Sequence, residues 1–96
     1  MSNVFFKTFP DFLKDQLPQY APLESQKPQG GGDINEAWQL QTAGGPLFLK
    51  MNDARQYPGM FAREAEALRY LKAHSPFRIP AVICADEWEG QAFLLL

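Results

Sequence analysis

Two residues of opposite charge, Lys50 and Glu64, are the side chains of this sequence best suited to carry chemistry. Lys50 lies in a strand-like run, Pro46 to Met51, and Glu64 follows on the expected apolar face of a helix. A carboxylate within an apolar stripe is costly unless it meets a cation. Lys50 is the natural candidate, because it leaves its strand on the side opposite the apolar residues. A lysine fixed by a carboxylate suits the binding of nucleotide phosphates.

A purely structural interpretation of the same pair is also open. Lys50 can extend along the sheet into solvent while Glu64 sits at the rim of the apolar stripe. The turn Gly30-Gly31-Gly32 upstream favours the chemical interpretation. Consecutive glycines let backbone N–H groups approach a phosphate, and in kinase-type sites such a turn joins the first two strands. The order strand, glycine turn, strand, hairpin and lysine strand therefore indicates a phosphate-binding site.

The elements that must position these residues predict class α+β. We expect a five-stranded antiparallel sheet with one long helix packed on it, preceded by a short N-terminal helix. The expected domains are a helical segment at 1–22 and a sheet-containing lobe at 23–96. The expected strands are 23–29, 35–42, 47–51, 81–88 and 91–96, and the long helix spans about 58–73.

Apolar spacing defines the two helices. Phe5, Phe9, Phe12, Leu13 and Leu17 recur at roughly helical spacing, with Pro10 expected in the first turn of the short helix. In the long helix the expected apolar face consists of Phe61, Ala65, Leu68 and Leu71, with Glu64 among them.

Composition excludes several classes of partner. The net charge of −2, with nine basic residues scattered among eleven acidic ones, argues against nucleic-acid binding. The single cysteine, Cys84, cannot form an internal disulfide, and with only one histidine a structural zinc site is not expected. No apolar run approaches the ~20 residues that span a bilayer, so no membrane partner is expected. The N-terminus lacks the features of a secretory signal, so a cytoplasmic location is expected.

Three segments resemble the N-terminal lobe of the fructosamine (ketosamine) kinase family. They are residues 30–37, 45–52 and 60–68, in the family's order and at similar spacing, and Ile79-Pro80 also matches. The resemblance implies the protein-kinase-like, aminoglycoside-phosphotransferase-like fold. It also implies an ATP- and Mg²⁺-dependent enzyme that phosphorylates sugars attached to amines and so repairs glycated proteins. The expected partners are therefore a nucleotide and a glycated amine or protein.

The resemblance also implies roles for individual residues. Lys50 would contact the α and β phosphates of ATP, Glu64 would pair with Lys50, and Gly30, Gly31 and Gly32 would form the phosphate-covering turn, although this turn departs from the G-x-G-x-x-G pattern. The catalytic and magnesium-binding aspartates would lie in a second lobe outside this chain. No catalytic residue or metal ligand is expected within the 96 residues, which alone should not catalyse phosphoryl transfer.

Two alternatives stay open at this point. The chain can be the lobe of a related aminoglycoside or choline kinase-like enzyme, or a stand-alone α+β interaction module. An isolated lobe should also expose apolar surface along the cleft and an unpaired strand edge near Phe93 to Leu96. We therefore expect self-association of the fragment.

Overall fold

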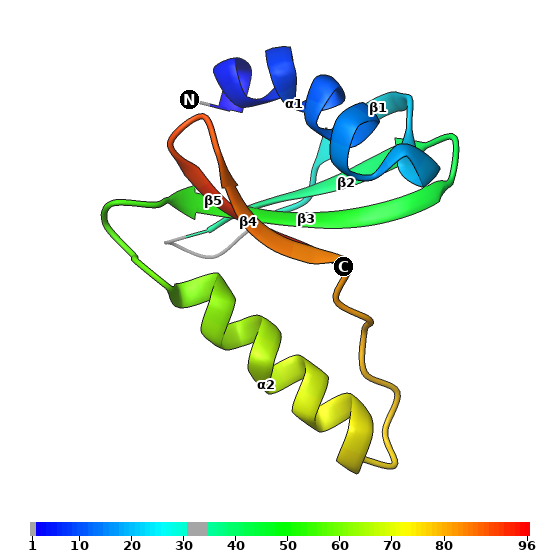
Figure 1. Cartoon of the computed structure of the whole chain (residues 1–96), viewed down its shortest axis with the longest axis vertical. Helices are drawn as coiled ribbons and strands as arrows, with labels where there is room; N and C mark the ends of the chain where they lie inside the picture. Colours follow the sequence, from blue (N-terminus) through cyan, green and yellow to red (C-terminus); the bar gives the residue numbers. More distant parts are fainter. Residues whose placement is uncertain (1, 31–34) are drawn as a thin grey trace.

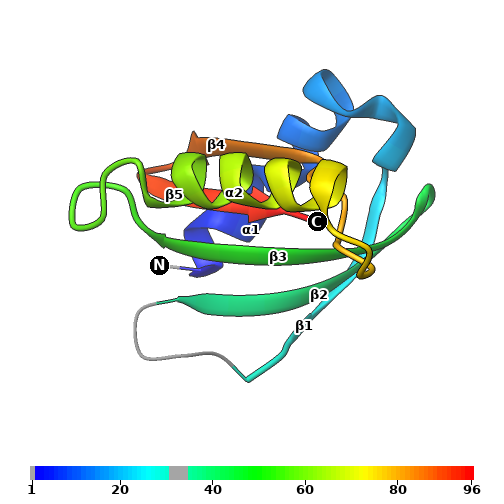
Figure 2. The same cartoon turned by 90° about the horizontal axis from the view of Figure 1, so that it is seen from below.

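The fold is a five-stranded antiparallel sheet with one helix on each face (Figures 1 and 2). A computed structural model of the chain describes residues 2–30 and 35–96. The strand order in the sheet is β1-β2-β3-β5-β4, and every neighbouring pair is antiparallel. The predicted α+β class is confirmed. The elements in chain order are α1 (Ser2–Gln16), a 3₁₀ turn (Pro18–Tyr20), β1 (Leu23–Pro28), β2 (Glu36–Thr42), β3 (Gly45–Asp53), α2 (Met60–His74), β4 (Cys84–Trp88) and β5 (Gln91–Leu95).

Helix α1 covers one face of the sheet with an apolar stripe. Phe5, Phe9, Phe12 and Leu13 are buried in a cluster that includes residues of β2, β3 and β5. The expectation of a short helix opening near Pro10 is wrong, because α1 runs over 15 residues with Pro10 inside it. An internal proline costs about 3 kcal/mol. Burying each large apolar side chain contributes about 1.5–3 kcal/mol, so the stripe outweighs that cost.

Both tryptophans join α1 to the sheet. The Trp38 ring lies with its centroid 4.7 Å from that of Phe6. The Trp88 indole Nε1–H donates a hydrogen bond of 3.0 Å to Thr8 Oγ1, and its ring lies 5.4 Å from that of Phe12. Because these contacts reach both β2 and β4, they fix α1 across the width of the sheet.

The central strand β3 has two chemically different faces. Leu47, Leu49 and Met51 are buried in the core cluster beneath α1. Successive side chains in a strand alternate between faces, so Lys50 projects on the opposite side, where α2 lies (Figure 1). The predicted direction of Lys50 is therefore confirmed.

Helix α2 is packed on the sheet mainly through its N-terminal part. Phe61 and Ala65 are buried and form a second cluster with Ala92 and Leu94 of β5. Leu71, which was expected on the buried face, is 45% exposed. Figure 1 shows the reason, since the C-terminal half of α2 extends away from the sheet. Helical periodicity identifies an apolar face but does not show how far along the helix a partner reaches.

The expectation that the final strand presents an unpaired edge is also wrong. β5 lies between β3 and β4 and hydrogen-bonds to both. Phe93, Leu94 and Leu95 are fully buried. The edge strands are instead β1 and β4. Among the described residues, neither helix has the length and apolar character needed to cross a membrane.

Cys84 provides a pH-dependent test of the fold. Burial, with a smaller contribution from Asp86 and opposed by Arg69, raises the pKa of the Cys84 thiol from 9.0 to about 11. The folded chain then holds the thiol proton more tightly than the unfolded chain does. The free energy of unfolding should therefore fall as pH rises from about 9 to about 11.

Cys84→Ala is expected to reduce this pH dependence, which urea unfolding at a series of pH values would measure. Alkylation of the native thiol at pH 8 should be much slower than that of free cysteine, because little thiolate forms. Alkylation at the rate of free cysteine would show that Cys84 is not buried in this way.

Candidate functional site

The centre of the candidate site is an ion pair between the sheet and α2. Lys50 Nζ of β3 lies 2.6 Å from Glu64 Oε2 of α2. The two side chains are 25% and 29% exposed, so solvent and ligands can reach both. Lys50 Nζ also lies 5.9 Å from the centroid of the Phe61 ring, within the range of a cation–π interaction. The pair that the sequence predicted is present.

The backbone before α2 brings Glu64 to Lys50. After β3 the chain turns through Gly59, whose φ of 73° lies in the left-handed region that favours glycine. Helix α2 then begins at Met60 and places Glu64 just beyond its first turn. Phe61 and Ala65, the neighbours of Glu64 on the helix, are anchored in the cluster with β5. The carboxylate is thus held by a packed helix turn, which limits the positions that the Lys50 ammonium can occupy.

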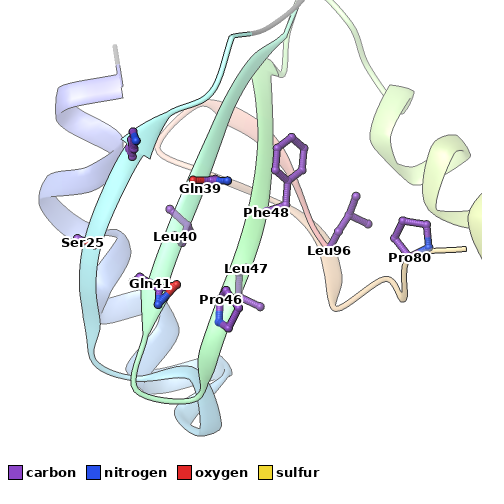
Figure 3. Close-up of a pocket in the computed structure, with 10 residues that line it drawn as sticks. Ser25, Gln39, Leu40, Gln41, Pro46, Leu47, Phe48, Pro80 and Leu96 are labelled. Atoms are coloured by element: carbon purple, nitrogen blue, oxygen red, sulfur yellow. The ribbon is translucent and has the colours of Figure 1, made fainter.

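A largely apolar pocket of about 680 Å³ lies on the same sheet (Figure 3). Its lining comes from β1, β2, β3, the segment before β4 and the last residue. The lining residues are Ser25, Lys27, Gln39, Leu40, Gln41, Pro46, Leu47, Phe48, Pro80 and Leu96. Pockets of 300–1,000 Å³ with mostly apolar walls and a few polar groups are typical of small-molecule sites.

The pocket and the ion pair share one face of the sheet. Phe48 and Lys50 are alternate residues of β3, so their side chains point the same way, roughly 6.6 Å apart along the strand. Gln39 lies opposite Phe48 in the β2–β3 ladder and therefore belongs to the same face. Leu96 pairs with Phe48 through two backbone hydrogen bonds of 2.9 and 3.0 Å. A ligand lying along β3 can therefore contact the apolar pocket and the ammonium group together.

The predicted glycine turn falls partly outside the described residues. Gly31 and Gly32 are not described, whereas Gly30 lies two residues beyond the end of β1. A Cβ atom built on Gly30 would meet no heavy atom of the described residues within 4 Å. The role of the three glycines in binding phosphate stays a prediction.

Sequence reasoning identified Lys50 and Glu64 but missed Phe48 of the pocket wall and Asn52 of β3. Phe48 alternates with Lys50 in the printed sequence, so strand periodicity alone could have placed it on the ligand side. Asn52 continues that alternation and is only 4% exposed. A buried amide two residues from a candidate binding lysine has no signal of its own in the sequence.

The chain is similar in sequence to proteins of one kinase family. A family model described as fructosamine kinase matches residues 5–96. A protein named probable ketoamine kinase from Pasteurella multocida is 31% identical over 84 residues, covering 88% of this chain and 29% of its own length. Another protein of that name, from Vibrio parahaemolyticus, is 33% identical over 66 residues, covering 69% of this chain and 23% of its own length.

Two solved structures are also similar to this chain. A crystal structure assigned to the fructosamine-3-kinases, from Haemophilus somnus, superposes with a TM-score of 0.76 at 28% identity, covering 94% of this chain and 30% of that one. An aminoglycoside phosphotransferase in complex with AMP-PNP and hygromycin B gives a TM-score of 0.58 at 16% identity, covering 92% and 28%, and so shares the fold. The chain spans less than a third of the length of these relatives. From the family match and the fold together, the chain belongs to the fructosamine kinase family.

Proposed function

We propose that the chain is the ATP-binding lobe of a phosphotransferase that phosphorylates ketoamines, the sugar adducts of amines. The observation that carries the proposal is the Lys50–Glu64 pair on the same sheet face as the apolar pocket. Ketoamine kinase is the name of several relatives, which supports the substrate class. The AMP-PNP in the structure of the aminoglycoside phosphotransferase supports an adenine nucleotide as the phosphate donor.

In this proposal the nucleotide occupies two parts of the site. The adenine ring would occupy the pocket against Phe48 and Leu96, where apolar contact with a flat ring excludes water. The phosphates would then extend along β3 to Lys50. The ammonium would neutralise charge on the α and β phosphates, while Glu64 holds it in place so that little reorganisation is needed when the nucleotide binds.

The remainder of the reaction would require groups supplied outside these residues. Within residues 2–30 and 35–96, no cluster of three or more histidine, cysteine, aspartate or glutamate side chains could hold a metal ion. The ligands of Mg²⁺ and the catalytic base would then come from a second lobe of the length seen in the relatives. In this proposal the 96 residues alone bind nucleotide weakly and do not transfer phosphate, and the whole enzyme acts on glycated amines in the cytoplasm.

Mapping the nucleotide contacts tests this arrangement directly. AMP-PNP added to the isotopically labelled gene product at its native length should shift the NMR signals of Phe48, Lys50 and Leu96. Residues of α1 that point away from the sheet, such as Lys14, serve as the internal control and should not shift. Signal shifts confined to residues of the α1 face would contradict the proposed site. The absence of any signal shift at high nucleotide concentration would also contradict it.

A further inference from the structure

Asn52 is an unusual buried polar residue at the end of the candidate site. It lies in β3 two residues beyond Lys50, on the same face, and only 4% of its surface is exposed. Its Nδ2 group donates one hydrogen bond of 3.0 Å to Asn35 Oδ1 and a second of 3.4 Å to Met60 Sδ. Both amide hydrogens are thus directed at acceptors from other parts of the chain.

The two acceptors belong to the segments that flank the ion pair. Asn35 directly precedes β2. Met60 is the first residue of α2, one turn before Glu64. One amide group therefore links the lysine strand to the start of β2 and to the helix that carries the glutamate. Figure 1 shows these segments converging at the same end of the sheet, where β3 leads into α2.

The carbonyl half of the same amide is not used. Asn52 Oδ1 is buried and has no hydrogen-bond partner among the described residues. A buried acceptor without a partner is unfavourable, and such groups in native structures call for an explanation. A leucine of similar volume at this position would avoid that cost, so stability alone does not account for the amide.

We propose that Asn52 is a positioning residue of the nucleotide site, whose buried amide fixes the start of β2 and the start of α2 relative to Lys50. The inference rests on the proposed function, because the element it orders is the phosphate-binding end of that site. Asn52 acts through Asn35 and through the helix that holds Glu64, and does not touch the nucleotide. A site ordered before binding loses less freedom when the ligand arrives, which strengthens binding.

Thr42 provides a matched control for this role. It is also 4% exposed, and its hydroxyl donates to Gly45 O at 2.7 Å and accepts from Gly44 N at 3.1 Å. These bonds close the β2–β3 turn, at the other end of β3 from Asn52. Thr42→Val therefore removes buried hydrogen bonds from the same pair of strands without touching the phosphate-binding end.

The test compares Asn52→Leu with Thr42→Val in the native-length gene product. Thr42→Val should lower the midpoint of thermal unfolding, whereas Asn52→Leu should change it little, because leucine loses the two contacts of the amide but no longer buries an unpartnered carbonyl. Asn52→Leu should also raise the KM for ATP about tenfold, equivalent to about 1.4 kcal/mol, with a smaller effect on kcat. Thr42→Val should leave the KM for ATP unchanged. Hydrogen exchange should accelerate at residues 35–40 and 60–66 in Asn52→Leu but not in Thr42→Val.

Should Asn52→Leu fail to fold, Asn35→Ala breaks the same hydrogen bond from its more exposed side and should raise the KM for ATP in the same direction. An unchanged KM together with unchanged exchange in the variant that folds would overturn the proposal while leaving the proposed function intact. Absence of ATP binding by the wild-type protein would overturn both, since no nucleotide site would exist to be ordered.

Discussion

Replacing Lys50 with alanine in the native-length gene product is expected to lower kcat/KM for ATP-dependent phosphorylation by about 100- to 1,000-fold, the usual cost of removing a fixed electrostatic contact to a reacting group. Lys50 Nζ is held 2.6 Å from Glu64 Oε2 on the sheet face that carries the apolar pocket, so alanine at this position would remove the cation that Glu64 orients. Lys50→Arg should also lose most activity, because a planar guanidinium does not reproduce a compact ammonium.

The control for this prediction is Lys14→Ala. Lys14 is exposed near the end of α1, on the opposite face of the sheet. Its removal changes the net charge by the same amount as Lys50→Ala but should leave kcat/KM unchanged. Circular dichroism should show that Lys50→Ala remains folded. Activity of folded Lys50→Ala within about threefold of the wild type, well short of the loss expected for a fixed contact, would remove Lys50 from the account.

Replacing Phe9 with alanine is expected to reduce the free energy of unfolding by about 3–5 kcal/mol, the typical cost of truncating a buried phenylalanine. The Phe9 side chain is fully buried in the stripe of α1. Its ring stacks on Phe5 at 4.5 Å and meets the edge of Phe93 at 5.5 Å. Because a domain of this size has a total stability of roughly 5–15 kcal/mol, this single change should remove a large part of it.

Phe77→Ala is the matched control for Phe9→Ala. The same side chain is removed, but Phe77 is 78% exposed in the loop after α2. Its loss should change the free energy of unfolding by no more than about 0.5 kcal/mol. Urea unfolding of the two variants beside the wild type measures the difference. Equal effects of the two substitutions would show that α1 is not packed on the sheet as described.

Local patterns predicted most of the elements and the directions of Lys50 and Glu64, whereas the preference for an ion pair at a phosphate site also depended on the order of the elements and on the family resemblance. The alternation in β3 placed Lys50 away from Leu47 and Leu49. The helical period placed Glu64 on the apolar face of the helix, between Leu68 and Leu71. These inferences succeeded because both periods are properties of the backbone that neighbouring residues determine. The predicted strand ends agree with the structure within two residues, except for the start of β4, which lies at Cys84 and not at Ala81.

The errors arose where contacts distant in sequence decide the outcome. Pro10 lies within α1 because burial of the aromatic stripe against the sheet outweighs a local penalty. Leu71 is exposed because the second half of α2 extends away from the sheet (Figure 1). The position of β5 inside the sheet depends on its pairing with β3, which no local pattern specifies.

The pocket and Asn52 could not be predicted for the same reason. The pocket exists because Phe48 pairs with Leu96 and with Gln39, which brings β2, β3 and the residue after β5 into one surface. The Asn52 amide becomes informative only when Asn35 and Met60 are seen beside it. Each of these observations requires the register of the sheet and the position of α2, which follow from the complete fold.

Phosphoryl transfer from ATP to a ketoamine is the measurement that tests the central claim most directly. The native-length gene product would be incubated with Mg²⁺-ATP and a peptide carrying a sugar adduct on its lysine amine, with the unmodified peptide as the control. The account predicts ADP release matched by one phosphate on each modified peptide, and no transfer to the unmodified peptide. Absence of transfer to the sugar adduct by a folded protein that still hydrolyses ATP, or equal transfer to both peptides, would contradict it.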